Sequence, residues 1–538
     1  MNIHHLSAGL LICLLAACSS SGSGGSDTAP PTTDAIVAAD TRVTDARAPD
    51  GQVVPTPDQG LADAAHFADA GGDVAPPTPD AAPPDARGPD AAPVPTDAAP
   101  PAPDGPATRP PPPPGGPPNF IFILGEARGW TSTSVQQDED IADSRSSMFL
   151  TPNLDRVAAE GMTFSDFYAP SPRCMPSRAS YFAGRSPAQI HMTFIPENGR
   201  DGTPVGNVVP PMPLTTLPPD LLNVASMLKS VGYATAHFGK WHAGNINPSM
   251  YGFDESDGPT TNVGPAGDVH PNPIEAFGIT ERGIDFMLRQ TEAGHPFYLQ
   301  LSHYGGTDQA NSLPDTYAAE AARLAGHSAK DIADSAVIRD MDTTIGQVLD
   351  ELDTLGIADR TYIFFSADHG RSGANANEPL NQGKGTVWEG GIRVPLLIRG
   401  PGIPQGTHSH VRATQVDLLP TMAELAQVPG PLPAELEGGS LWSVLTSGTG
   451  EVARSREAFV VHFPHYDKDP AGPASAIILG PYKLIHFYED DSLHLYDIEQ
   501  DYAEQHDLAA QMPDRVQELS QRMADYLTAV GAQMPGHL

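Results

Sequence analysis

The run Asn119-Phe-Ile-Phe-Ile-Leu-Gly125 decides the fold of the globular part of this chain. It is short, almost wholly apolar and closed by a glycine, which is typical of a β-strand buried on both faces. Similar strand-like runs recur at residues 233–238, 297–301 and 362–366. We therefore expect a sheet whose strands are covered on both sides.

Helical patterns separate these strand-like runs. Residues 151–161 begin with Thr151 and Pro152 and end at Gly161, the usual start and stop signals of a helix. Before the later strands, apolar residues recur at helical spacing: Leu221, Ala225, Leu228 and Val231, then Ile284, Met287 and Leu288, then Val337, Met341, Ile345, Val348, Leu352 and Leu355. Alternating helices and strands indicate a largely parallel sheet with helices on both faces.

The C-terminal part has a different pattern. Strand-like runs follow one another at residues 458–461, 476–479, 482–487 and 493–496, and a last helix spans about 513–530. This order predicts a small antiparallel α+β subdomain. The predicted fold class is thus α/β, a large mostly parallel sheet between helices, with the subdomain attached. We place the main domain at 117–454 and the subdomain at 455–538.

Polar side chains follow the predicted strands at the point where each strand ends. They are Glu126 and Arg128, Lys240 and His242, His303, and Asp368 and His369. In an open α/β sheet, ligands bind outside the carboxyl ends of the strands. A glycine-rich loop that carries Lys384 leads into another strand, at residues 394–398. The sequence therefore predicts a binding site along one edge of the sheet.

The segment Pro170-Ser-Pro-Arg-Cys174-Met-Pro-Ser-Arg178-Ala-Ser-Tyr-Phe-Ala-Gly-Arg185 contains the one cysteine of the globular part, because Cys13 and Cys18 lie in the N-terminal leader. A single cysteine there is either an inert core residue or a reactive group. Pro176 suits the first turn of a helix. Cys174 is therefore expected just before a helix N-terminus, where free N–H groups favour an anion.

Cys-x-Pro-Ser-Arg followed by Gly-Arg resembles the signature of the formylglycine sulfatases, a family of the alkaline phosphatase superfamily. The resemblance covers about residue 117 to the end, including Gly480-Pro-Tyr-Lys-Leu-Ile485 in the subdomain. It implies that maturation machinery oxidises Cys174 to formylglycine (3-oxoalanine), whose hydrate attacks the sulfur of a sulfate ester. The implied activity is that of a sulfuric ester hydrolase, similar to arylsulfatases.

The resemblance also implies a role for each polar residue. Arg178 fixes the hydrated aldehyde, Lys240 and Lys384 bind sulfate oxygens, and His242 acts as a base. The metal ligands would be Glu126, Asp368, His369 and the modified Cys174, and the implied ion is Ca²⁺.

The first departure from the family lies in Leu124-Gly-Glu-Ala-Arg-Gly-Trp130, where the family has a pair of aspartates. Glu126 stands in for the first aspartate and Ala127 for the second. Because calcium affinity follows the number of charged oxygen ligands, we expect a weakened metal site. Arg128 either adds positive charge to the sulfate site or is an ordinary surface arginine. Asp138, Glu139 and Asp140 lie nearby in the sequence, but no spacing argument recruits them.

The second departure is Thr307, which stands where the family carries a substrate-contacting histidine. His303 lies four residues earlier and is the candidate substitute in substrate binding. General acid help is worth a factor of about 10²–10⁴, so its loss would restrict the enzyme to good leaving groups or slow it.

The first 116 residues contain no predicted domain. Residues 1–17 read as a signal peptide, and Leu15-Ala-Ala-Cys18 resembles the lipobox of bacterial lipoproteins, which implies a lipid anchor at Cys18. Plain cleavage without lipidation is the alternative. Residues 18–116 are rich in Pro, Ala and Asp and are expected to form a disordered tether. The protein is thus expected to be exported and anchored to the cell envelope, at a bacterial outer membrane.

Composition and motif together leave three functional readings. The net charge of −36 argues against nucleic-acid binding. The first reading is hydrolysis of sulfate esters in a small molecule or a glycan. The second is a phosphoester or phosphonate hydrolase of the same superfamily, and the third is a sulfatase-like protein that binds sulfated glycans without turnover. Segments 196–219 and 245–280 are expected to determine substrate choice.

Overall fold

A computed structural model describes residues 116–195, 205–262, 274–306, 309–373 and 376–538, which belong to one compact unit, Ala99–Leu538. The predicted signal peptide and Cys18, the tether up to residue 115, Thr307 and parts of the two segments expected to choose the substrate lie outside the described residues. Within the described ranges, no helix combines the length and apolar character needed to cross a membrane.

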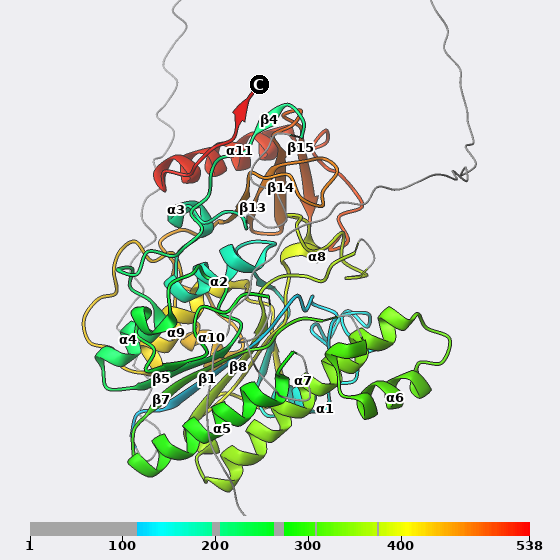
Figure 1. The fold of residues 1–538 in the computed structure, drawn as a ribbon. Helices are drawn as coiled ribbons and strands as arrows, with labels where there is room; N and C mark the ends of the chain where they lie inside the picture. Colours follow the sequence, from blue (N-terminus) through cyan, green and yellow to red (C-terminus); the bar gives the residue numbers. More distant parts are fainter. Residues whose placement is uncertain (1–115, 196–204, 263–273, 307–308, 374–375) are drawn as a thin grey trace, which may run out of the picture. The chain divides into compact units, whose positions relative to one another are not determined.

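Eight strands form the main sheet, with β1 near its centre (Figure 1). In sheet order the strands are β10 (Thr407–Ser409), β2 (Met162–Phe164), β9 (Leu396–Arg399), β8 (Thr361–Ala367), β1 (Asn119–Gly125), β7 (Phe297–Ser302), β5 (Ala234–Gly239) and β6 (Glu255–Ser256). Strand β1 pairs in parallel with β7 and β8, and only β9 runs antiparallel to its neighbours in this sheet. The predicted mostly parallel sheet is confirmed.

Helices cover both faces of the sheet, because alternate residues of β1 enter two different cores. Ile121 and Ile123 pack with α1 (Pro152–Ala159), α5 (Ala276–Ala293) and α7 (Ala329–Thr354). Phe120, Phe122 and Leu124 pack with α2 (Cys174–Ala183), α4 (Val224–Ser230), α9 (Leu418–Leu425) and α10 (Trp442–Ser447). Figure 1 shows α5 and α7 along one face and α2, α4 and α9 on the other.

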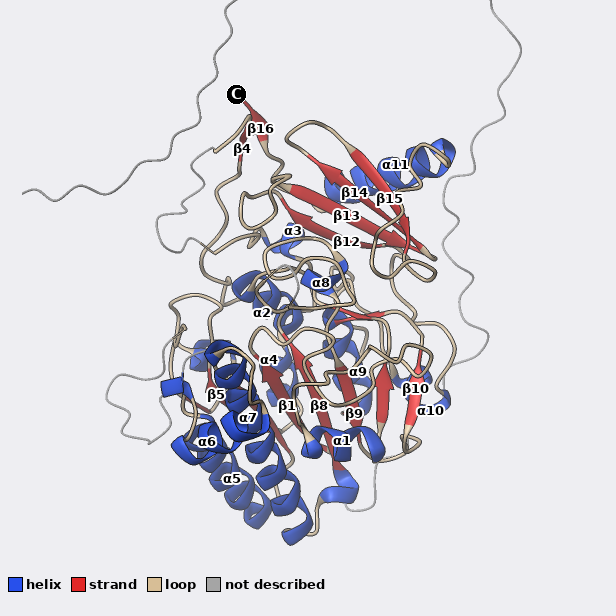
Figure 2. Ribbon diagram, turned by 90° about the vertical axis from the view of Figure 1, so that its right-hand side faces the viewer, coloured by secondary structure: helices blue, strands red, loops and turns tan. Residues whose placement is uncertain are grey.

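The C-terminal strands form a separate antiparallel sheet, as predicted (Figure 2). Its strands are β12 (Phe459–Phe463), β13 (Ala474–Leu479), β14 (Tyr482–Phe487) and β15 (Leu493–Asp497). One face packs against α11 (Pro513–Ala529). The other face packs against residues of the main domain, Tyr168, Val387 and Ile392. The subdomain therefore shares a hydrophobic core with the domain that carries Cys174.

Most of the elements that the sequence did not predict are short, although α6 (Pro314–Arg323) has ten residues. They are β3 (Phe167–Tyr168), β4 (Val208–Val209), β11 (Ala413–Thr414), β16 (Gly536–His537), α3 (Pro187–Ile190), α6 and α8 (Glu389–Ile392). The helix predicted from Leu221 begins only at Val224, because Asn223 caps it: the Asn223 side chain accepts from the N–H of Ser226 at 2.9 Å.

Candidate active site

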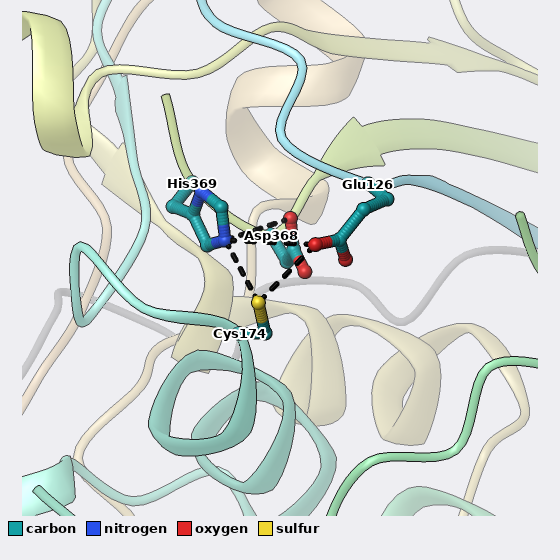
Figure 3. A group of neighbouring side chains, drawn as sticks. All are labelled: Glu126, Cys174, Asp368 and His369. Carbon is teal, nitrogen blue, oxygen red and sulfur yellow. Dashed lines mark hydrogen bonds and ion pairs between the residues drawn. The ribbon is translucent and has the colours of Figure 1, made fainter. Parts of the chain in front are cut away.

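Three of the polar residues predicted at the strand ends, Glu126, Asp368 and His369, gather around the sulfur of Cys174 (Figure 3). Glu126 follows β1, and Asp368 and His369 follow β8, while Cys174 comes from the start of α2. The sulfur lies 3.2 Å from Glu126 Oε1 and 3.1 Å from His369 Nε2. All four side chains are buried, and each can bring one ligand atom within 4.8 Å of the others.

Helix α2 fixes the position of Cys174. Cys174 is its first residue rather than the residue before it, and Pro176 lies in its first turn. All ten residues of the helix are buried, so it is packed on every side. Gly184 ends the helix in the left-handed conformation, with φ of 64°, which glycine adopts without strain.

Arg178, one turn further along α2, ties Cys174 to the sheet. Its guanidinium donates to Asp368 Oδ2 at 3.0 Å, to Glu126 Oε2 at 2.9 Å and to the backbone carbonyl of Lys240 at 2.6 Å. These three acceptors follow β8, β1 and β5. One side chain thereby fixes three strand ends relative to the helix that carries the cysteine.

Two lysines surround the same point. Lys240 Nζ lies 2.9 Å from Glu126 Oε2 and donates to Asn262 Oδ1 at 2.6 Å. Lys384 Nζ lies 3.5 Å from the Cys174 sulfur and 3.5 Å from Glu126 Oε1. Arg178, Lys240 and Lys384 thus bring three positive charges to a buried site that holds two carboxylates. No sequence signal pointed to Asn262, which lies in a loop.

The charges shift the acidity of the buried groups. Burial and Glu126 raise the pKa of the Cys174 thiol, but Lys240, Lys384 and His369 outweigh them and hold it well below its ordinary value. For Glu126, burial is likewise outweighed by Lys240 and Lys384, and its pKa is lowered. Burial and the neighbouring Glu126 raise the pKa of Asp368 to about 6. The site therefore favours an anion at the position of the sulfur.

The backbone carbonyl of the next residue, Gly370, orients the imidazole of His369. Its Nδ1 lies 2.8 Å from the carbonyl oxygen of Gly370, which can only accept, so Nδ1 carries the proton. In the neutral ring, Nε2 then presents a lone pair to the Cys174 sulfur. A thiolate has no proton and a thiol only one, yet two acceptors, Glu126 Oε1 and His369 Nε2, lie within reach of the sulfur.

The loops that bring in Lys384 are tied to the cysteine segment. The N–H of Gly385 donates to the carbonyl of Pro172 at 3.0 Å. Arg173 pairs with Asp467 of the C-terminal subdomain, with Nη2 donating to Asp467 Oδ1 at 2.8 Å. The subdomain thereby helps to hold the loop that precedes Cys174, a contact that the sequence did not predict.

Three further predicted residues, Arg128, His303 and His242, are also buried. Arg128 is not a surface arginine: it is buried and pairs with Asp334 at 2.7 Å. Burial and Arg128 lower the pKa of His303 to about 4, and its Nδ1 has no hydrogen-bond partner among the described residues. His242 is buried two residues after Lys240, with a positive φ of 49°. The role predicted for His303 in substrate binding stays a prediction, as does that of His242 as a base.

The residues present do not match the ligand set of calcium. Ca²⁺ binds roughly six to eight oxygen ligands, with metal–oxygen distances of about 2.3–2.6 Å. The group around Cys174 offers two carboxylates, a sulfur and an imidazole nitrogen. Arg178 already occupies one oxygen of each carboxylate, and Ala127 contributes only its N–H, which donates to Asp368 Oδ1 at 2.8 Å. The family typically uses Ca²⁺, but the described residues around Cys174 offer fewer oxygen donors than that ion takes.

Comparison with known proteins agrees with this geometry. The family described as Sulfatase matches residues 118–428, and the one described as N-sulphoglucosamine sulphohydrolase, C-terminal, matches residues 382–533. The chain is 33% identical to N-acetylgalactosamine-6-sulfatase of Sus scrofa over 369 residues, which cover 62% of this chain and 66% of that protein. The chain thus spans just under two thirds of the length of this relative.

Two further similarities point the same way. Arylsulfatase A of Bos taurus is 30% identical over 398 residues, which cover 64% of this chain and 71% of that protein. The solved structure of Ps i-CgsB in complex with k-i-k-neocarrahexaose superposes with a TM-score of 0.63 at 23% identity, covering 76% of this chain and 93% of that one. The similarity to the structure of Ps i-CgsB concerns the fold alone.

Proposed function

Because this chain belongs to the sulfatase family, we propose that it hydrolyses sulfate esters and uses a formylglycine made from Cys174. This proposal rests on the atoms that surround the sulfur of Cys174. Two acceptors and one lysine ammonium lie within 3.5 Å of it. A hydrated aldehyde has two hydroxyl groups where the thiol has one proton, so it would satisfy both Glu126 and His369.

Formylglycine supplies a hydroxyl nucleophile for the sulfur of the ester. The protein's own residues prepare the site for it. Lys240 and Lys384 place positive charge where the sulfate oxygens would bind, and Arg178 holds Glu126 and Asp368 in position. Preorganised charge in a buried site is usually the largest contribution to such catalysis. Glu126 and His369 accept the protons of the nucleophile and so orient it.

The proposed substrates are sulfated sugars or aryl sulfates. The curated relatives are named N-acetylgalactosamine-6-sulfatase and arylsulfatase A, so the two classes follow from their names. Near neutral pH, His303 is uncharged because its pKa is about 4, and a neutral imidazole is a weak proton donor. We therefore expect faster turnover of phenol sulfates, whose leaving groups need no proton.

The experiment compares an aryl sulfate with the matching aryl phosphate, using protein produced together with the formylglycine-generating machinery. Wild type should cleave the sulfate faster, and Cys174→Ala should abolish that cleavage. A faster phosphate reaction would instead favour the phosphoester hydrolase. If a sulfated glycan binds to wild type without any turnover, the protein is a binder rather than an enzyme.

We further propose that Cys18 is lipidated and that residues 18–116 tether the enzyme to the cell envelope. This proposal rests on the lipobox-like Leu15-Ala-Ala-Cys18. Cys18→Ser should move the protein from the membrane fraction to the soluble fraction of a bacterial host. An unchanged membrane fraction would argue against the anchor.

A further inference from the structure

Asp138 and Glu139 lie in the loop after β1, but they do not join the cluster at Cys174. They lie instead against His408 of the edge strand β10 and against His410, just beyond its end. His408 and His410 are two residues apart, so their side chains leave the extended chain on the same side. Asp138, Glu139 and His410 can each bring one ligand atom within 4.8 Å of the others, and His408 adjoins them through Glu139. This surface group, Asp138, Glu139, His408 and His410, shares no residue with the active-site cluster.

The distances within the surface group are longer than those of ordinary charged hydrogen bonds. Glu139 lies between the two rings, with Oε2 3.6 Å from His408 Nδ1 and Oε1 3.3 Å from His410 Nε2. Asp138 Oδ2 lies 3.7 Å from His410 Nδ1. A charge-assisted N–H···O bond is about 2.7–2.9 Å long. The side chains therefore approach one another without forming short hydrogen bonds.

The positions of the ring protons make this arrangement of imidazoles and carboxylates unfavourable unless a cation is bound. His408 Nε2 lies 3.0 Å from the carbonyl oxygen of Gln136, so Nε2 carries the proton and Nδ1 presents a lone pair to Glu139. A neutral His410 has one proton, yet both of its nitrogens lie near carboxylates. Lone pairs and carboxylates in contact repel each other unless positive charge lies between them.

We propose that the surface group binds one divalent transition metal ion of the Zn²⁺ class. Imidazole nitrogen and carboxylate oxygen are ligands that Zn²⁺ prefers, and at bond lengths of about 2.0–2.2 Å the ligand atoms of a tetrahedral site lie roughly 3.3–3.6 Å apart. Glu139 Oε1 and His410 Nε2, 3.3 Å apart, match this spacing, and Asp138, Glu139 and His410 can each bring one ligand atom within 4.8 Å of the others. Two carboxylates and two neutral rings carry a charge that one divalent ion balances.

The surroundings already hold the ligands in place. A metal-bound histidine commonly donates its second ring N–H to a carbonyl, as His408 does to Gln136. The Gln136 side chain donates to the carbonyls of Asp138 and Glu139 at 3.0 and 3.2 Å, which fixes the loop. Arg393 acts electrostatically on Asp138, but it already pairs with Asp166 at 2.8 Å. The ion would fasten strand β10 to the loop after β1.

Equilibrium dialysis against ZnCl₂ tests the proposal, with bound zinc measured on full-length protein that has no polyhistidine tag. Every sample carries Cys174→Ala, so that the active-site cluster lacks its thiol. The test variant adds His408→Ala and His410→Ala. The matched control adds His486→Ala and His494→Ala, because each of these histidines lies beside one carboxylate, at 3.3 and 2.9 Å.

The test variant should lose one equivalent of bound zinc, and its melting temperature should no longer rise when zinc is added. The control should keep both properties. Equal zinc binding by the test variant and its parent would overturn the proposal. A parent that binds no zinc would also overturn it, because the surface group would then take protons only. Metal-free melting temperatures show whether both variants fold.

Discussion

Arg178 shows how much of the active site depends on one side chain. It is buried, and it joins Glu126, Asp368 and the carbonyl of Lys240 through three separate nitrogens. A guanidinium presents its donors in a fixed plane, so it can hold acceptors from several strands in one geometry. Lysine has the same charge, but its three N–H donors share one nitrogen, which cannot reach acceptors placed around the three nitrogens of a guanidinium.

Arg178→Lys should therefore destabilise the fold and abolish sulfatase activity. Breaking a buried ion pair costs about 3–5 kcal/mol, because it leaves buried charge uncompensated. Chemical denaturation measures this loss. Arg156→Lys is the matched control: Arg156 makes three ion pairs near the surface, and its replacement should change stability by less than about 1 kcal/mol. Equal losses in both variants would contradict the role given to Arg178.

Ala127 is the residue at which a calcium site could be rebuilt. It has a positive φ of 51°, a conformation that aspartate tolerates better than alanine. Its N–H donates to Asp368, so a carboxylate at position 127 would lie near the cluster. Ala127→Asp should raise the affinity for Ca²⁺, measured by calorimetry, and should not lower the melting temperature. Unchanged calcium affinity would show that the missing carboxylate is not what limits this site.

The relative positions of single residues could be predicted where a motif placed them on one element. Cys174 and Arg178 lie on one helix, so their spacing determined their relation in space. His303 and Arg128 lie on loops, where spacing determines little, and Arg128 turned instead to Asp334. The partners of Asp138 and Glu139 lie about 270 residues away, beyond the reach of any local pattern.

At the scale of elements, the loop after β8 and the Lys384 loop, at its junction with α8, approach each other closely next to His369. Gly370 follows β8, and a β-carbon built there would lie 1.8 Å from the carbonyl oxygen of Gly390. The N–H of Gly370 also donates to Gly391 at 3.0 Å. Glycine is needed at this position because two backbones touch, and the contact aligns His369 with the loop that carries Lys384.

Gly370→Ala should push these loops apart and lower kcat, since His369 and Lys384 both lie against the nucleophile. The measurement is kcat with an aryl sulfate, alongside the melting temperature. Gly536→Ala is the control, because its nearest neighbour, Val209, would be 3.8 Å away in ordinary contact. If the Gly370 variant keeps wild-type kcat, the alignment of the loops does not matter for turnover.

The length of an element decided whether the sequence could predict it. Strands β1, β7 and β8 are apolar runs of six or seven residues, and their burial on both faces is visible in the composition. Strand β10 has three residues, Thr407, His408 and Ser409, which carry no strand signal. Long-range pairing with β2 makes it a strand, so only the folded chain reveals it.

At the scale of the whole molecule, a buried charge network joins the C-terminal sheet to the main domain. Lys483 of β14 lies 3.0 Å from Glu389 of α8 and 2.8 Å from Glu504. Glu389 also accepts from the hydroxyl of Tyr168 at 2.9 Å. One lysine cannot neutralise two buried carboxylates, so burial, opposed in part by Lys483, raises the pKa of Glu504 to about 7.

This shift predicts how stability depends on pH. An acid whose pKa is higher in the folded protein binds its proton more tightly when folded, so its contribution to stability falls as pH rises from about 4.5 to about 7. Glu504→Gln should flatten the fall in melting temperature over this range. Glu518→Gln is the control, because Arg515 lowers the pKa of Glu518 and moves its titration below the range. Identical slopes in wild type and Glu504→Gln would refute the shift.

The central claim is that Cys174 becomes the nucleophile of this site. The most direct measurement is the mass of the tryptic peptide that runs from Cys174 to Arg178, from protein produced with the formylglycine-generating machinery. The account predicts a peptide lighter by the difference between a CH₂SH and a CHO group, with aryl sulfatase activity in proportion to its abundance. A peptide that keeps the thiol in fully active protein would contradict the account.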